Sequence, residues 1–205
     1  SLNGGLKFSM SALAYRTIAL LLRFACPLTI LYVSSSEVMG KYYLFSSFYT
    51  FCIFLTSLET AIPFSRIYLR TKGELQKRKT FSIFVTNSIL LSFFLSIPLV
   101  IFQLWTTSIS PLCAFLFALT IATGSCVNEV GRFFWNVGQS HVASRRDFWT
   151  SVGFLGAIVS SAIVFKEVIS PLSFSIIVLF NCLLLRNELK RYGRGFKFYP
   201  HTFIE

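Results

Sequence analysis

Residues 12–33 read ALAYRTIALLLRFACPLTILYV, and this stretch decides the kind of fold that the chain adopts. Its charged side chains are Arg16 and Arg23, and most of the others are apolar. A helix of about 20 mostly apolar residues is long enough to cross roughly 30 Å of hydrocarbon. The stretch therefore predicts a helix that spans a membrane and carries two arginines.

Five more apolar stretches follow along the chain and predict five further spans. They are residues 42–64, 81–104, 112–127, 148–165 and 172–185. The composition agrees, because a chain of 205 residues that is 54% hydrophobic and 13% charged has too little polar surface for a soluble domain. Sheets with open edges cannot face lipid. We therefore expect an all-α fold: one lobe of six transmembrane helices over residues 1–205, with a basic tail at 186–205.

The basic residues are distributed very unevenly around these stretches. Of the 19 Lys and Arg residues, all but Lys41 and Lys166 lie on one predicted side. Basic loops resist translocation, so we expect both termini and the polar connections 71–80 and 128–147 on the cytoplasmic side of the inner membrane. Anionic lipid headgroups beside the spans account for the net charge of +11. Nucleic acid is not expected as a partner.

The two arginines of the first span lie seven residues apart, so a helix places them on one face. Arg16 is close enough to the end of the span to reach the headgroups. Arg23 is near the bilayer midplane, where an arginine costs at least ~2.5 kcal/mol and normally faces a polar cavity or partner. For Arg23 the alternatives are contact with an anionic ligand and a structural pairing with Glu59 or with a polar residue. Glu59 is either an ion-coupling carboxylate or the partner of Arg66 at the membrane boundary.

Polar and small residues within the later spans favour helix packing. Asn181 is isolated in an apolar run, so we expect it to hydrogen-bond to a neighbouring helix. Gly153, Ala157 and Ser161 follow one another at four-residue spacing, which places them on one helical face. Small residues let helix backbones approach closely, and this stripe therefore predicts a packing face.

The remaining polar residues do not form a catalytic set. Glu129 and Arg132, at the exit of the fourth span, are expected to pair in a solvated helix end. The sequence has no metalloprotease motif, no glycine-rich phosphate loop and no nucleophile with a matching base. The five cysteines show no metal-binding spacing and are expected to be small buried hydrophobes. We expect neither an enzyme nor a bound metal or cofactor.

The beginning of the chain also carries a family resemblance. The link after the first span contains the pattern Glu-x-x-Gly-x-Tyr at Glu37, Gly40 and Tyr42, and the second span closes on AIPFSR at residues 61–66. With the polar first helix, this region resembles the start of an O-antigen-type polysaccharide flippase of the multidrug/oligosaccharidyl-lipid/polysaccharide exporter superfamily. The chain departs from the family at residues 58–60, Leu-Glu-Thr, where members usually carry a glycine.

The resemblance implies a fold of two six-helix lobes around a central cavity, of which this chain covers the amino-terminal lobe. We therefore expect a truncated product or a half-sized subunit that pairs with a second lobe or a second copy. The implied function is to flip a polyprenyl-pyrophosphate-linked oligosaccharide across the cytoplasmic membrane for cell-surface polysaccharide synthesis. Arg23, and then Arg16, would contact the pyrophosphate, because a guanidinium binds phosphate oxygens bidentately.

Two other functions remain open at this point. One is a non-transporting membrane subunit that gathers cytoplasmic partners on its basic loops and tail. The other is a drug or cation antiporter of the same superfamily, which would favour carboxylates over arginines in its cavity. The sign of the buried charge separates a flippase from an antiporter, and Arg23 favours the flippase.

Overall fold

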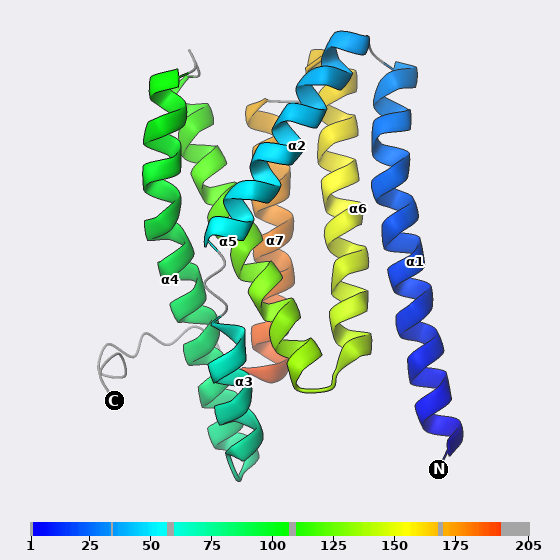
Figure 1. Ribbon diagram of the computed structural model, residues 1–205, viewed down its shortest axis with the longest axis vertical. Helices are drawn as coiled ribbons and strands as arrows, with labels where there is room; N and C mark the ends of the chain where they lie inside the picture. The colour runs from blue at the N-terminus through cyan, green and yellow to red at the C-terminus, as the bar shows by residue number, and fades with distance from the viewer. Residues whose placement is uncertain (1, 34, 57–59, 107–109, 168–169, 194–205) are drawn as a thin grey trace.

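The described part of the chain is built from helices. The computed structural model describes residues 2–33, 35–56, 60–106, 110–167 and 170–193, and side-chain burial for these except at 2–9, 33 and 102–106. These ranges contain no strand and hold α1 (Leu2–Val33), α2 (Ser36–Thr56), α3 (Ala61–Arg70), α4 (Glu74–Thr106), α5 (Pro111–Asn136), α6 (Ser140–Phe165) and α7 (Pro171–Tyr192) (Figure 1). The expected all-α class is confirmed for this part of the chain.

Most of these helices are long and apolar enough to cross a membrane. Five helices are long and apolar enough on their own: α1 through its segment Met10–Tyr32, α4, α5, α6 and α7. The pair α2 and α3 passes only together, as one span broken by a bend of 50°. The described residues therefore contain five helices able to span a bilayer, or six if the bent pair is one span. This pattern indicates a multi-pass membrane protein.

The helix ends separate into two groups at opposite ends of the bundle (Figure 1). The start of α1, the short helix α3, the turn between α5 and α6, and the end of α7 lie together. The end of α1 and the starts of α2 and α7 lie at the other end. The first end carries, among others, Arg66, Arg70, Lys77, Arg132, Arg145 and Arg191, whereas Lys41 and Lys166 belong to the second. The uneven charge of the sequence is therefore an uneven charge of the folded bundle.

Three helices continue past the apolar stretches that predicted them. α4 already begins at Glu74, α5 runs to Asn136, and α6 begins at Ser140. The predicted bounds of the polar connections, 71–80 and 128–147, are therefore wrong, because the connections are much shorter. Tight turns at Gly73 and Gly138, with φ of +102° and +78°, replace them. The hydropathy of the sequence falls at the first charged residue of each stretch. The helix itself can continue through such residues, because their polar side chains find partners.

The link expected between the first two spans is also mostly helical. Because α2 begins at Ser36, Glu37 and Gly40 lie in its first turns and Tyr42 follows on the same helix. Lys41 Nζ lies 2.8 Å from Glu37 Oε1, an i, i+4 ion pair of the kind that supports an exposed helix. The Glu-x-x-Gly-x-Tyr pattern thus belongs to a helix start.

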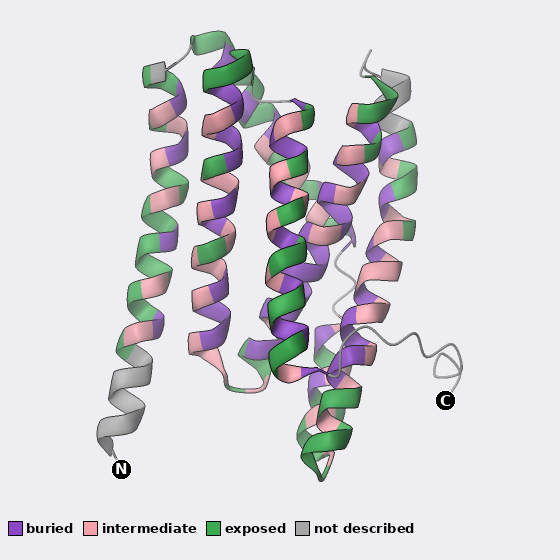
Figure 2. Cartoon of the chain, turned by 180° about the vertical axis from the view of Figure 1, so that it is seen from behind, coloured by how far each residue is buried: buried purple, intermediate pink, exposed green. Residues whose placement is uncertain are grey.

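α1 stands at the edge of the bundle and packs along α6 (Figures 1 and 2). Most of its surface is exposed, and its buried residues are Ala12, Ala19, Cys26 and Ile30. The first three are small and follow at seven-residue spacing, so they form one narrow stripe. Small residues permit close backbone approach between membrane helices. This stripe fixes the rotation of α1 and therefore the direction of its arginines.

α5 is the central helix and contacts α2, α3, α4, α6 and α7. Two buried aromatic clusters surround it. The first includes Phe45, Phe117 and Phe174, and the second includes Phe81, Phe84, Phe133 and Phe134. Ile121 of α5 belongs to the first cluster and Cys126 to the second, and Gly124 lies between them on the helix.

Glu129 is a buried helix cap, and its expected place in a solvated helix end is wrong. Its side chain is 1% exposed. Glu129 Oε2 accepts hydrogen bonds from the backbone N–H of Ala61 at 3.0 Å and from Thr60 Oγ1 at 3.1 Å. Arg132 Nη1 lies 3.6 Å from the other carboxylate oxygen. A carboxylate at a helix N-terminus satisfies free N–H groups and the helix dipole, so Glu129 fixes the start of α3 against α5.

The expected packing face on α6 is confirmed. Gly153, Ala157 and Ser161 are all buried. A Cβ at Gly153 would overlap the ring of Phe180 on α7, whereas a Cβ at Gly156, on the same helix, would meet nothing within 4 Å. The absence of a side chain at Gly153 is therefore what lets α6 and α7 approach each other.

We predict that Gly153→Ala destabilises the protein by about 1–3 kcal/mol, because the added methyl overpacks against Phe180. Gly156→Ala is the matched control and should be neutral or stabilising by up to about 1 kcal/mol, since alanine favours helix more than glycine does. Thermal unfolding in mild detergent measures both. Equal melting temperatures for the two variants would contradict the contact, and Gly153→Ala combined with Phe180→Leu should recover the lost stability.

Candidate functional site

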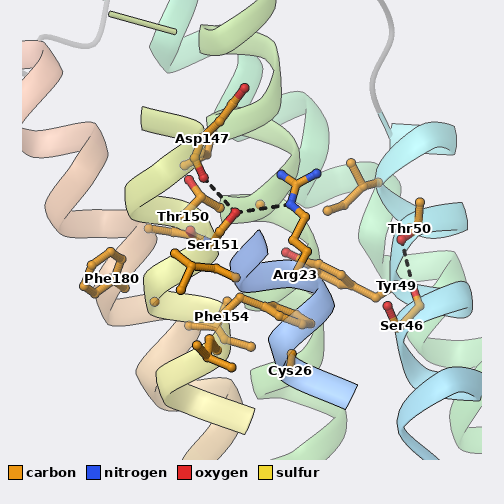
Figure 3. A pocket seen from close by; sticks show the side chains of 18 of the residues that line it. Arg23, Cys26, Ser46, Tyr49, Thr50, Asp147, Thr150, Ser151, Phe154 and Phe180 are labelled. Carbon is orange, nitrogen blue, oxygen red and sulfur yellow. Dashed lines mark hydrogen bonds between the residues drawn. The ribbon is translucent and has the colours of Figure 1, made fainter. Parts of the chain in front are cut away.

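A pocket of about 460 Å³ lies between α1, α2, α5, α6 and α7 (Figure 3). Its polar lining comprises Arg23, Tyr42, Ser46, Tyr49, Thr50, Asn128, Asp147, Thr150, Ser151 and Asn181. Its apolar lining includes Leu22, Ile53, Phe154, Ile177 and Phe180. Pockets of about 300–1,000 Å³ with a few converging polar groups are typical ligand sites. The mixed lining suits an amphiphilic or glycosidic molecule.

Arg23 lines this pocket, as expected of an arginine in the middle of a span. It lies near the centre of the apolar segment Met10–Tyr32. Its Nε donates a hydrogen bond of 3.2 Å to Ser151 Oγ on α6, and Ser151 Oγ in turn donates one of 2.8 Å to the backbone oxygen of Asp147 (Figure 3). A guanidinium has five N–H donors, and the Nε bond uses one of them. Its two Nη groups point away from Ser151 in Figure 3.

Asp147 is a pocket residue that the sequence analysis missed. It lies on α6 one turn before Ser151 and lines the same pocket as Arg23. Arg146 precedes it on the same helix, and Arg23 lines the same pocket from α1. Helical spacing could have revealed it, because Asp147, Thr150, Ser151 and Phe154 recur at offsets of three, four and seven residues. The pocket therefore holds both signs of charge.

Arg16 lies nearer to the end of the bundle and is not part of the pocket lining. Its guanidinium sits over the ring of Trp135 at the end of α5, 5.8 Å from the centroid, which is a cation–π contact. The side chain is exposed, which agrees with the expected reach toward the headgroups. The structure thus separates the two arginines by depth and leaves Asp147 within the electrostatic reach of both.

α2 forms the wall opposite α6 and is tied to α5 and its neighbours by polar contacts. The Tyr49 hydroxyl fills the space that Gly124 leaves open, and Thr56 hydrogen-bonds to Ser125. Asn181 of α7 donates to Thr123 Oγ1 of α5 at 3.3 Å, so its expected role between helices is confirmed. The same asparagine also lines the pocket.

Arg146 is buried, although the sequence placed it among the basic residues that only mark topology. Its side chain is 2% exposed, and Nε, Nη1 and Nη2 have no hydrogen-bond partner in the described part of the chain. It occupies the space left by Gly131 and lies 6.0 Å from the ring centroid of Phe134. Glu188 of α7, 7% exposed, is a carboxylate whose charge acts on it. Arg146 therefore carries a buried charge between α5, α6 and α7.

Glu59, the expected coupling or structural carboxylate, lies outside the described residues. Its pairing with Arg23 or Arg66 stays a prediction. Within the part of the chain that the structure describes, no group of three or more His, Cys, Asp or Glu side chains gathers as metal ligands would.

Comparison with known proteins adds no relative. No protein-family model matches the chain, and neither a curated protein nor a solved structure does. The resemblance at Glu37, Gly40 and Tyr42 therefore stays a prediction. The pocket has to be interpreted from its own geometry.

We predict that Arg146→Met destabilises the protein by about 3–5 kcal/mol, because it removes the positive charge that acts most strongly on the buried Glu188 carboxylate. Arg146→Met combined with Glu188→Gln should recover most of this loss, since the double variant removes the buried negative charge as well. The measurement is the free energy of unfolding in mild detergent.

Arg145→Met provides the matched control for this experiment. Arg145 precedes Arg146 on α6 but is only half-buried, so we expect a change below about 1 kcal/mol. A loss at Arg146 no larger than the loss at Arg145 would show that the two buried charges do not interact.

Proposed function

We propose that this chain is a lobe of a membrane transporter that moves a polyprenyl-pyrophosphate-linked oligosaccharide across the cytoplasmic membrane. The observation that carries the proposal is the position of Arg23, a permanently charged side chain in the middle of a span and in the wall of a ligand-sized pocket. A guanidinium matches the planar, bidentate geometry of phosphate oxygens. Arg23 would hold the pyrophosphate, and Arg16 would meet it nearer to the membrane surface.

The rest of the lining supports the same ligand class. Asn128, Asn181 and the hydroxyls of Ser46 and Thr50 can donate and accept hydrogen bonds, as a sugar requires. The apolar lining suits the first isoprenoid units of a lipid carrier. A pocket of about 460 Å³ holds a diphosphate with one sugar, and a longer glycan would extend from it.

The exposure of Arg23 supports a second lobe. Its side chain is exposed in this chain, although a charged group at mid-span is too costly to face lipid. Water in a central cavity, or another protein surface, must therefore meet it. A second lobe, or a second copy of this chain, would enclose that cavity, and rocking of the two lobes would give alternating access.

The charge distribution supports a direction for the lobe. Basic side chains gather at the end of the bundle where α1 starts and α7 ends. Basic segments stay in the cytoplasm and are attracted to its anionic leaflet. We therefore place both termini in the cytoplasm.

Asp147 favours one alternative, a cation or drug antiporter. A carboxylate in the pocket could hold a cationic substrate or a coupling ion. Replacing Asp147 with Asn would then abolish transport of the cation, whereas the flippase proposal assigns the substrate contact to Arg23.

We predict that Arg23→Gln reduces translocation of lipid-linked oligosaccharide in proteoliposomes at least tenfold, because the amide cannot supply a charged, bidentate contact to phosphate. Arg23→Lys should retain part of the activity. Arg70→Gln, an exposed residue at the end of α3, is the control and should transport normally. Unchanged transport by Arg23→Gln would overturn the anion site.

A further inference from the structure

The pocket contains its own counter-ion. Arg23 and Asp147 line it from adjacent helices, and Ser151 connects them by accepting from Arg23 Nε and donating to the Asp147 backbone. Figure 3 shows the Arg23 side chain reaching from α1 to Ser151 on α6, with Asp147 one turn away on the same helix. An anion that enters this pocket therefore meets a carboxylate as well as a guanidinium.

Helix packing does not explain the carboxylate. α1 is held against α6 by the small-residue stripe of Ala12, Ala19 and Cys26, which needs no ion pair. Asp147 is only half-buried, and its side chain borders the pocket. Its charge thus acts where a ligand would bind.

The charges that line the pocket balance. In the part of the chain that the structure describes, Arg23 and Asp147 are the charged residues of the lining, one of each sign. Removing the Asp147 charge would leave the Arg23 charge without a counter-charge beside the ligand. In a region of low dielectric constant such a change has a large effect on anion affinity.

A moderate affinity is what a transporter requires. A site must bind its ligand well enough to capture it and weakly enough to release it on the other side. An arginine without a counter-ion would hold a pyrophosphate more tightly and slow its release. A fixed carboxylate beside the guanidinium offsets part of that attraction.

We infer that Asp147 is the specificity-determining counter-ion of the Arg23 pocket: it lowers the affinity of the site for phosphate-bearing ligands and so permits their release. The inference rests on the proposed function, because it takes Arg23 as the anion-binding residue. Asp147 thus weakens ligand binding and raises the transport rate. Replacing a purely structural residue would not strengthen binding while it slows transport.

The test is calorimetric titration of inorganic pyrophosphate into the full chain in nanodiscs of zwitterionic lipid. We expect Asp147→Asn to bind at least tenfold more tightly than the parent chain and Arg23→Gln to bind at least tenfold more weakly. The double variant, which has lost one charge of each sign, should return to within about threefold of the parent. Glu37→Gln, an exposed acidic residue at the start of α2, is the control and should not change the affinity.

Two further arms complete the experiment. Discs that contain phosphatidylglycerol should weaken the apparent pyrophosphate affinity if anionic lipid headgroups compete for the same site. In proteoliposomes, Asp147→Asn should lower both the maximal transport rate and the substrate concentration at half-maximal rate. Melting temperatures of all variants, measured in the same discs, identify any that fail to fold.

The outcomes separate the two proposals. If Arg23→Gln weakens pyrophosphate binding but folded Asp147→Asn binds no more tightly, the counter-ion inference is overturned and the anion site stands. If Arg23→Gln binds as the parent chain does, or if neither the parent nor Asp147→Asn binds pyrophosphate, the anion site fails and the inference fails with it.

Discussion

A guanidinium in the middle of a membrane span cannot face hydrocarbon, and the arrangement around the pocket follows from that constraint. Arg23 is such a group, and its Nε donates to Ser151 of α6. The small-residue stripe of α1 rotates the helix so that Arg23 reaches α6. Arg23 also lines a pocket whose other walls are α2, α5, α6 and α7. One polar side chain thus links the packing of α1 to the position of the candidate site.

Buried charge is also concentrated below the pocket, where the helices continue past their apolar stretches. Glu129 caps α3 from α5, and Arg146 lies between α5, α6 and α7 with Glu188 nearby. These groups are costly to bury unless they are paired. They specify one arrangement of the helices at the basic end of the bundle. The helices that border this end of the pocket are therefore fixed relative to one another.

The sequence predicted the helical class and the positions of most spans, because hydropathy reports directly on burial in lipid. It also predicted that Arg23 faces a polar cavity or a polar partner, since a mid-span arginine is too costly to leave in lipid. The sequence did not predict the burial of charged residues, because the charge of a residue alone does not reveal its partner in the fold. Glu129 follows one apolar stretch and Arg146 precedes the next, as solvated residues would, and only their contacts with the start of α3 and with Gly131 show that they are buried. Asp147 was hidden for the same reason, at the border of a span.

The central claim is that the Arg23 guanidinium binds the phosphate of an anionic headgroup. Solid-state NMR can measure this contact directly, through the dipolar coupling between ³¹P of bound pyrophosphate and ¹⁵N of labelled arginine side chains in bilayers. We expect a strong coupling, typical of direct hydrogen bonding, that Arg23→Lys removes and Arg70→Lys retains. A coupling that survives Arg23→Lys unchanged would show that the phosphate binds elsewhere.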